Sequence, residues 1–399
     1  SCKFFQLTSQ TIEINRSLAS YTSKKYLRIG YIGHTLRSHS VGWLSRWLIS
    51  NHHRDKFYVA VYLVDENSDN LTKKLADNVD RFRVFINQSF EESAQIIAND
   101  EIDILIDLDS CTFPRTCRIL SLKPAPIQVS WLGWDASGLP AIDYYLADPY
   151  VLPKNAQDYY QETIWRLPHS YVAVKGFEVS VPSLTREKLE IPSEATVYLS
   201  PQTALKHHPD TVRLQMKILK GVPNSYFIIK GRSDKELLKK VFNEISEAEG
   251  IDFQRLRFLE LDPNELIHRA NLGIADVVLD TYPYNGATTT LETLWMGVPL
   301  VTKVGEQYVA RNSYTFLKNA GVEEGIAWTD EEYVQWGVKL GTDENLRRDV
   351  HWKLLQSRKT SPLWDVEQFV NDMETAYQQM WEKYVSQREI AVTSEDGNY

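Results

Sequence analysis

The sequence predicts an α/β protein made of two doubly wound domains. Short apolar runs, of the kind found in buried parallel sheets, alternate with helical segments of about ten residues. This alternation occurs twice, on either side of a polar segment bracketed by prolines at residues 182–192. A chain of 399 residues is long enough for two such domains, each with a core of its own.

The first alternation defines an N-terminal domain, which we place at residues 27–181. Its expected strands are residues 27–32, 57–64, 82–86, 102–107 and 127–131, with short extended pieces at 142–147 and 163–167. Helices are expected at residues 43–50 and 91–99, with polar helical sequence reaching Ala76. Right-handed crossovers would place the strands in one parallel sheet. Residues 1–26 are polar and irregular, and we assign them to a linker or to the tail of an upstream module.

The second alternation defines a C-terminal domain at residues 182–362. Its expected strands are residues 196–200, 226–230, 256–259 and 277–279, and one that ends at residue 302. Its expected helices are residues 210–221, 234–249 and 263–271. A last helix, placed at residues 363–386, carries an apolar stripe made of Val366, Phe369, Val370, Met373, Tyr377, Met380, Trp381 and Tyr384. We expect this helix to pack across both domains and residues 387–399 to form a disordered tail.

Residues 275–302 form the most informative stretch, which follows a strand, turn, helix, turn, strand pattern. Asn285-Gly286 breaks the first strand, and Thr288 to Thr290 offer hydroxyls where a helix should begin. Such a start presents free N–H groups and the positive end of a helix dipole, which suit a phosphate. Glu292, one turn later, could accept hydrogen bonds from a ribose hydroxyl pair. The pattern indicates a nucleotide-diphosphate site at the carboxyl ends of parallel strands, although a capped helix without a ligand would look the same locally.

Composition and charge exclude several classes of function. The net charge of −9 argues against nucleic acid or an anionic membrane as the main partner. No apolar run is long enough to span a membrane, and no signal peptide opens the chain, so we expect a cytoplasmic location. The three cysteines, Cys2, Cys111 and Cys117, fit neither a zinc spacing nor an even disulfide framework. We expect a reducing compartment, with Cys111 and Cys117 as free, buried thiols.

The sequence gives only weak evidence for metal ligands. Asp107-Leu108-Asp109 is an Asp-x-Asp at a strand end, which metal-dependent sugar transferases use to hold manganese and diphosphate. A single triplet is weak evidence, and we expect no metal. The pairs His52-His53 and His207-His208 have no carboxylates at ligand spacing, and we interpret both as surface pairs.

Two Rossmann-like domains, a proline-marked hinge and a terminal helix make the architecture of GT-B glycosyltransferases, with the ligand in the cleft between the domains. Residues 285–299, with the sequence NGATTTLETLWMGVP, resemble the O-GlcNAc transferase and SPINDLY family, glycosyltransferase family 41, and look closest to its bacterial members. The likeness runs from about residue 27 to about residue 384. It also rests on residues 30–32, 37–42, 123–133, 268–280 and 305–311.

The resemblance implies inverting transfer of a sugar from a nucleotide donor to a Ser or Thr hydroxyl of a protein, without a cofactor. It assigns Lys206 to the departing diphosphate, His268 to the base and Glu292 to the ribose. Thr288 and Thr289 bind phosphate, within a nucleotide-sugar-binding turn that also holds Asn285, Gly286, Ala287 and Thr290. Taken alone, Lys206 would be a solvated loop lysine and His268 an ordinary helix-face histidine.

The resemblance assigns the catalytic base to His39, whose residue type titrates in a suitable range. His39 could equally be a loop residue that orients the substrate. His34, in the same loop, is the second candidate for the base. We therefore expect His39 and Lys206 to be the catalytic residues.

Departures from the family pattern leave the donor open. Animal members carry histidine where this chain has Ala287, many bacterial members have Gly-His in place of Ser110-Cys111, and residues 134–138 lack the usual Tyr-Pro-Gly. UDP-N-acetylglucosamine is the expected donor, with GDP-fucose as its rival. A non-catalytic module that binds a sugar nucleotide or a protein is the alternative from another class. The family's helical TPR repeats are missing from this sequence, and we expect them upstream in a parent chain.

Overall fold

The computed structural model describes residue 12, residues 24–232 and residues 234–396 of a chain that divides into two compact units. Unit 1 holds the described residues up to Pro149, Pro153–Ala173 and the chain from Val366 onwards. Unit 2 holds Tyr150–Leu152 and Val174–Asp365. Cys2 and most of the predicted linker at residues 1–26 lie outside the described residues.

The division between the units falls at residues 173 and 174, before the proline-bracketed segment that we took as the boundary. Backbone hydrogen bonds explain why the boundary comes earlier than predicted, because the stretch after residue 173 already bonds to residues of unit 2. The N–H of Val174 donates to the carbonyl of Leu363 at 2.9 Å, and the N–H of Ser180 donates to that of Leu266 at 3.2 Å. The proline-bracketed segment therefore lies inside unit 2.

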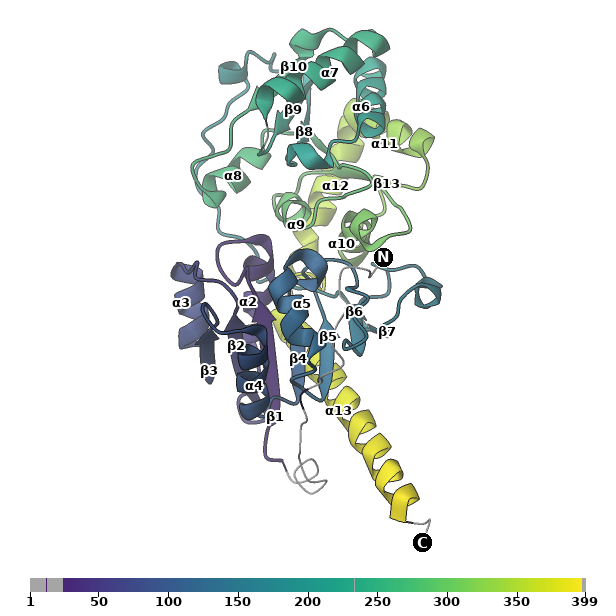
Figure 1. Ribbon diagram of the computed structural model, residues 1–399. Coiled ribbons are helices and arrows are strands. Elements are labelled where there is room, and N and C mark those ends of the chain that lie inside the picture. Colours follow the sequence, from purple (N-terminus) through teal and green to yellow (C-terminus); the bar gives the residue numbers. More distant parts are fainter. Residues whose placement is uncertain (1–11, 13–23, 233, 397–399) are drawn as a thin grey trace. The chain divides into compact units, whose positions relative to one another are not determined.

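Unit 1 contains a seven-stranded parallel sheet with the strand order β3-β2-β1-β4-β5-β6-β7 (Figure 1). The strands are β1 (Leu27–Gly33), β2 (Phe57–Leu63), β3 (Arg81–Val84), β4 (Ile104–Asp107), β5 (Ile127–Ser130), β6 (Tyr144–Ala147) and β7 (Thr163–Arg166). The helices are α2 (Ser40–Asn51), α3 (Asn70–Asp77), α4 (Phe90–Asn99), α5 (Pro114–Ser121) and α13 (Val366–Asp396), with short 3-10 turns η1 (Ser110–Thr112) and η2 (Ala156–Asp158). The strand order reverses between β1 and β4, which is where doubly wound folds bind ligands.

Unit 2 repeats this topology in a six-stranded parallel sheet with the order β10-β9-β8-β11-β12-β13. The strands are β8 (Thr196–Ser200), β9 (Ser225–Lys230), β10 (Leu256–Leu259), β11 (Val277–Leu279), β12 (Leu300–Lys303) and β13 (Ile326–Ala327). The helices are α6 (Pro209–Gly221), α7 (Lys235–Glu249), α8 (Glu265–Leu272), α9 (Thr288–Trp295), α10 (Asn312–Asn319), α11 (Asp330–Thr342) and α12 (Glu344–Ser357), and the 3-10 turns are η3 (Glu187–Leu189), η4 (Ala204–Lys206), η5 (Phe253–Arg255) and η6 (Tyr308–Ala310). Its switch point lies between β8 and β11. We predicted no elements between residues 303 and 362, so η6, α10, β13, α11 and α12 are new.

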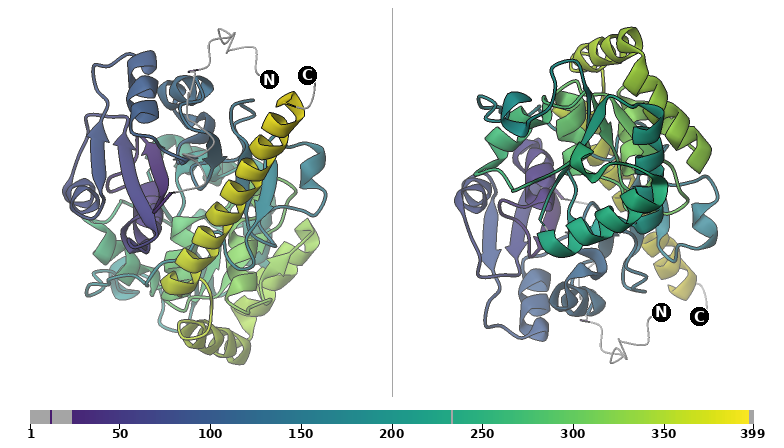
Figure 2. Two further views of the ribbon diagram at one scale, coloured as in Figure 1. Left: turned by 90° about the horizontal axis from the view of Figure 1, so that it is seen from below. Right: turned by 90° about the horizontal axis from the view of Figure 1, so that it is seen from above.

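The long helix α13 packs on α2 and β5 of unit 1 (Figure 2). The apolar stripe is buried as far as Trp381, which confirms its role in packing. The helix continues to Asp396, whereas we expected a disordered tail from residue 387. No glycine or proline occurs between residues 366 and 396 to end it, and Gly397 is the first such residue. Packing of this helix across the second domain stays a prediction.

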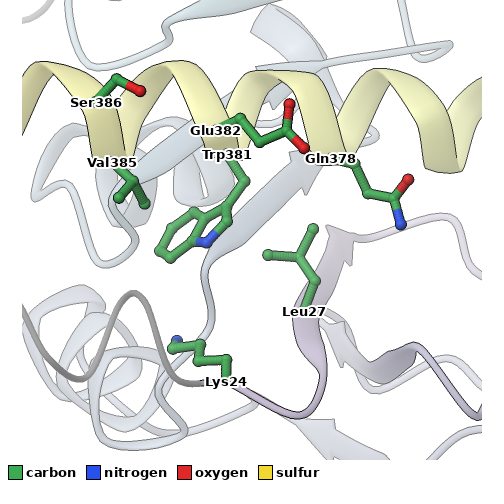
Figure 3. Close-up of a pocket in the computed structure, with 7 residues that line it drawn as sticks. All are labelled: Lys24, Leu27, Gln378, Trp381, Glu382, Val385 and Ser386. Atoms are coloured by element: carbon green, nitrogen blue, oxygen red, sulfur yellow. The ribbon is translucent and has the colours of Figure 1, made fainter.

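A pocket of about 540 Å³ lies between α13 and the start of β1 (Figure 3). Trp381 points from the helix toward Lys24, whose Nζ lies 5.1 Å from the centre of the indole ring. The same ammonium pairs with the buried carboxylate of Asp103. The lysine thus ties the segment that leads into β1 both to the helix and to the sheet.

A buried histidine joins α13 to the end of α2. His52 is 4% exposed, and its Nδ1 lies 2.9 Å from Oε1 of Glu374, while its Nε2 lies 2.7 Å from the hydroxyl of Tyr31. His53 donates its backbone N–H to Glu374 at 2.8 Å. Our interpretation of His52-His53 as a surface pair was wrong for His52, because its carboxylate partner is 322 residues away and no local spacing could reveal it.

The second histidine pair also consists of one buried and one exposed side chain. His207 is buried, with Nε2 3.3 Å from the carbonyl oxygen of Gln202 and its ring against Phe242, whereas His208 is exposed. Burial lowers the pKa of His207 to about 4, so the ring is neutral at pH 7. The surface interpretation was therefore wrong for the first histidine of each pair.

Replacing Glu374 by alanine removes the acceptor of three donors that follow α2, namely Nδ1 of His52 and the backbone N–H and Nδ1 of His53. The His52 side chain, which is buried, loses its carboxylate partner. We expect the free energy of unfolding to fall by about 3 kcal/mol, as for a broken buried pair. Urea denaturation followed by circular dichroism measures this. Glu382→Ala, on the exposed face of the same helix, is the matched control and should change stability by less than about 0.5 kcal/mol. Equal losses in the two variants would contradict the role of Glu374.

Candidate active site

The switch point of unit 2 is organised by a buried carboxylate at the end of β11. Asp280 is 1% exposed and accepts hydrogen bonds from the backbone N–H of Thr281 at 2.9 Å, the N–H of Gly286 at 2.8 Å and the hydroxyl of Thr302 at 2.8 Å. Burial raises the pKa of Asp280, and hydrogen bonds from Ser313, Gly286 and Thr302 oppose that rise. Since the bonds come from both ends of the loop and from β12, they hold the loop at residues 281–286 in one shape.

Lys206 approaches the same loop from η4, after β8. Its Nζ donates to the backbone carbonyl of Asn285 at 2.9 Å and lies 3.8 Å from the centre of the Tyr284 ring. Burial lowers the pKa of Lys206 to about 8. Among the residues that the structure describes, it forms no ion pair with a carboxylate within 4.0 Å, so its charge remains available to an anionic ligand.

The start of α9 lies beside this loop. Ala287 precedes the helix and supplies no side-chain cap, so the first N–H groups keep their capacity to bind an anion. Gln202, in the loop that carries Lys206, donates to the hydroxyl of Thr289 at 2.8 Å. The hydroxyl of Thr288 is buried without a hydrogen-bond partner among the described residues, as is Oδ1 of Asn285. Unpaired buried polar atoms are uncommon, and here they lie where a diphosphate is predicted.

Gly286 allows this loop to close on the helix. A Cβ atom added there would lie 2.5 Å from the hydroxyl of Thr290 and 2.6 Å from the amide nitrogen of Gln202. Thr290 itself is bonded to the hydroxyl of Ser313 at 2.8 Å. Of the predicted phosphate-binding turn, Thr290 therefore has a structural partner, whereas Thr288 has none among the described residues.

Glu292 and His268 meet on facing helices. Oε1 of Glu292 accepts a hydrogen bond from Nε of Arg269 at 2.7 Å, and Oε2 lies 3.8 Å from Nε2 of His268. Burial lowers the pKa of His268 to about 4 and raises that of Glu292. One carboxylate oxygen is thus held by a guanidinium, and the other faces a neutral imidazole, an arrangement compatible with ribose hydroxyls.

We did not identify three charged residues of this cluster from the sequence. Arg269 orients Glu292, and Lys230 pairs with Asp262, whose Oδ2 also lies 3.5 Å from Nδ1 of His268. Lys230 is the last residue of β9, and Asp262 lies three residues after the end of the neighbouring strand β10, so their position near the carboxyl ends of adjacent strands is a signal that could have identified them.

Unit 1 carries the two candidate bases at the end of β1. His39 is exposed and precedes α2, and its Nδ1 accepts a hydrogen bond from the N–H of Val41 at 3.3 Å. Loss of hydration and then the Arg37 cation lower the pKa of His39. His34 pairs instead with Asp109, its Nδ1 2.8 Å from Oδ1. His39 belongs to unit 1 and Lys206 to unit 2, so the predicted catalytic pair is divided between the units.

Both carboxylates of the Asp-x-Asp triplet accept hydrogen bonds from other groups of the protein. Asp107 accepts from the backbone N–H groups of Asp109 and Ser110, at 2.9 and 3.0 Å, and Asp109 accepts from His34 and from the hydroxyl of Thr116. Burial, and then the charge of Asp109, raise the pKa of Asp107 to about 7. Among the described residues, no group of three or more His, Cys, Asp or Glu side chains could hold a metal ion.

The two cysteines near this triplet are free thiols. Cys117 is buried and Cys111 is exposed. Our prediction of a buried thiol is therefore confirmed for Cys117 and wrong for Cys111.

The two parallel sheets, each with a switch point between its first and fourth strands, define the GT-B class of fold. The chain belongs to glycosyl transferase family 41, whose model matches residues 6–177 and 173–373. The resemblance drawn from the sequence is thereby confirmed.

The chain is similar to the tomato (Solanum lycopersicum) protein named probable UDP-N-acetylglucosamine–peptide N-acetylglucosaminyltransferase SPINDLY, with 29% identity over 92% of this chain and 40% of the relative. It is also similar to the UDP-N-acetylglucosamine–peptide N-acetylglucosaminyltransferase of Caenorhabditis elegans, with 25% identity over 96% of this chain and 43% of the relative. The chain thus spans about two fifths of the length of the curated relatives it matches.

Solved structures support the fold. A lysine-to-methionine mutant of Thermobaculum terrenum O-GlcNAc transferase matches with a TM-score of 0.84 and 28% identity, over 96% of this chain and 71% of that one. The Anabaena protein HepE, solved with UDP and glucose, matches with a TM-score of 0.59 and 11% identity, over 88% of this chain and 100% of that one, which shows the fold alone. No helix within the described ranges is long and apolar enough to cross a membrane.

The lowered pKa of Lys206 predicts how binding of a diphosphate depends on pH. The lysine is protonated below pH 8 and loses its charge as the pH rises through 8, so UDP should bind about tenfold more weakly at pH 9 than at pH 7. Calorimetric titration with UDP at a series of pH values measures this. Lys206→Arg stays charged and should flatten the dependence, whereas the same slope in that variant would show that another group titrates.

Proposed function

We propose that this chain is the catalytic region of an inverting glycosyltransferase that moves a sugar from a nucleotide donor to a Ser or Thr hydroxyl of a protein. One observation carries the proposal: Lys206 lies beside the loop that leads into the uncapped start of α9, at the switch point of unit 2. Lys206 has no carboxylate partner among the described residues. Membership of family 41 and the names of the relatives supply the reaction class.

The transfer requires charge stabilisation where the diphosphate departs. The acceptor oxygen attacks the anomeric carbon on the face opposite the diphosphate, and the bond from that carbon to the phosphate oxygen breaks with its electron pair. Negative charge grows on the leaving group, and Lys206 and the N–H groups from Thr288 to Thr290 stabilise it. The acceptor proton passes to a base, for which the family resemblance suggests His39, or to the donor's own phosphate. These groups supply the stabilisation without a metal or another cofactor.

The donor we propose is UDP-N-acetylglucosamine. His268 is neutral at pH 7 and suits packing beside an uncharged base, and Oε2 of Glu292 suits the ribose hydroxyls. The names of the relatives support a UDP-sugar. GDP-fucose remains the rival because of Ala287. The acceptor is a protein, and we propose that upstream TPR repeats in a cytoplasmic parent chain select it.

A non-catalytic module that binds a sugar nucleotide or a partner protein is the second candidate. Ser110 and Cys111 favour it, because they replace the Gly-His of many bacterial members. Ser110 has a left-handed backbone, with a φ of 53°, which is the conformation that a glycine at this position would adopt without strain. The backbone at position 110 thus has a conformation that suits the glycine of those members, while the side chains at positions 110 and 111 differ from theirs.

Transfer assays with radiolabelled UDP-N-acetylglucosamine and GDP-fucose test the proposal, using mass spectrometry to find the modified residues. We expect turnover with the UDP-sugar, and Lys206→Ala should lower kcat about 100-fold or more, because it removes a charge that acts in the transition state. The control is Lys217→Ala, which removes an exposed lysine from α6 of the same unit and should leave turnover unchanged.

Two outcomes would contradict the proposal. Nucleotide binding without hydrolysis or transfer of any donor would favour the non-catalytic module. Transfer of fucose but not of N-acetylglucosamine would keep the reaction class and overturn the donor.

Replacing Glu292 by glutamine tests the ribose assignment. The substitution removes the negative charge that pairs with Arg269, and the glutamine amide accepts weaker hydrogen bonds than the carboxylate. UDP should therefore bind about tenfold more weakly. Titration with UDP and with inorganic pyrophosphate separates the effects. Only UDP should be affected, and equal weakening of both ligands would show that the change disturbs the phosphate site instead.

A further inference from the structure

A histidine–carboxylate pair lies at the switch point of unit 1, between β1 and β4. Nδ1 of His34 is 2.8 Å from Oδ1 of Asp109, and the backbone N–H of His34 donates to both oxygens of the same carboxylate, at 2.9 and 3.1 Å. Thr116 donates its hydroxyl to Oδ2 at 2.6 Å. Asp109 is 1% exposed, so this carboxylate is fixed from several sides in a buried position.

The pair defines which nitrogen of His34 is free to accept a proton. An ionised carboxylate can only accept a hydrogen bond, so Nδ1 must carry the hydrogen and Nε2 keeps its lone pair. The imidazole is stacked on Phe113, with ring centres 4.3 Å apart and planes 11° from parallel. The side chain is 22% exposed. The ring is therefore oriented, and part of it remains accessible.

A glycine leaves room beside the pair. A Cβ atom at Gly33 would lie 3.2 Å from Oδ1 of Asp109 and 3.1 Å from Cβ of Leu108. These are tight contacts, so a side chain at position 33 would require Leu108 or the carboxylate to shift by a few tenths of an ångström.

His39, the base suggested by the resemblance, has the opposite arrangement. Its Nδ1 accepts the N–H of Val41 at the start of α2. The neutral ring therefore carries its hydrogen on Nε2, and it can accept a proton only at the nitrogen that caps the helix. Taking that proton would break the cap, which contributes about 1 kcal/mol to helices in general.

We infer that His34, oriented by Asp109, is the general base of this chain, an inference that rests on the proposed function. Nε2 of His34 takes the proton of the acceptor hydroxyl while the acceptor oxygen bonds to the anomeric carbon. The bond from that carbon to the diphosphate breaks, and the electron pair leaves with UDP. The imidazolium, stabilised by the carboxylate, then releases its proton to water. His34 is the catalytic residue, Asp109 is a positioning residue, and His39 serves to cap α2.

The test compares variants of the two histidines in hydrolysis of UDP-N-acetylglucosamine and in transfer to a pool of Ser/Thr peptides. His34→Asn keeps a donor for Asp109 but has no basic nitrogen, and His34→Ala removes the ring. We expect both to lower kcat about 100-fold or more, while the Kd for UDP changes less than about twofold. Added imidazole should restore part of the activity of His34→Ala, which a structural role would not allow. His39→Ala should cost less than about tenfold and show no rescue.

Asp109→Asn tests the positioning role, since it removes the charge that stabilises the imidazolium. Its kcat should fall about tenfold or more with KM nearly unchanged. Turnover of His34→Asn within threefold of wild type, or imidazole rescue of His39→Ala instead, would overturn the inference and leave the proposed function intact. Wild-type protein that binds UDP but turns over no donor would overturn both.

Discussion

The buried carboxylate of Asp280 is the constraint on which the proposed nucleotide site depends. A carboxylate at 1% exposure is costly unless several donors satisfy it, and here the loop itself supplies two of them. The loop therefore closes at residues 281–286 because its own N–H groups must reach this carboxylate. That closure turns the carbonyl of Asn285 toward Lys206 and brings Gly286 against the start of α9. The lysine and the helix start are positioned by the same buried charge.

A site built in this way suits the stabilisation of a leaving diphosphate. Donors that are already oriented need no reorganisation when negative charge appears, and their effect is larger where water is excluded. Lys206 is buried enough for its pKa to fall to about 8, which leaves it charged near neutral pH. The second cluster, around Glu292, has a different character because two carboxylates are balanced by Arg269 and Lys230. The first cluster is open to an anion, and the second is nearly neutral, as a nucleoside would require.

Much of the fold could be predicted from the sequence, because its signals are local. Apolar runs gave the strands of both sheets except β13, and the Gly286 to Thr290 stretch gave the turn before α9. Contacts between distant parts of the chain could not be predicted, among them His52 with Glu374 and Arg269 with Glu292. No local pattern marks such pairs, since each partner looks like an ordinary surface residue. The end of α13 was missed because polarity was taken for disorder, although no residue there breaks a helix.

The roles assigned to individual site residues remain predictions, and the structure sharpens some more than others. Lys206 and Thr288 have the environment that their roles require, whereas the exposed, capping position of His39 suits a base less well than the oriented ring of His34.

A crystal structure of this chain with UDP tests the central claim most directly. We predict the two phosphates within hydrogen-bond distance of Nζ of Lys206, the Thr288 hydroxyl and the first N–H groups of α9. A nucleotide bound elsewhere, or one in this unit with Lys206 still bonded only to the carbonyl of Asn285, would contradict it.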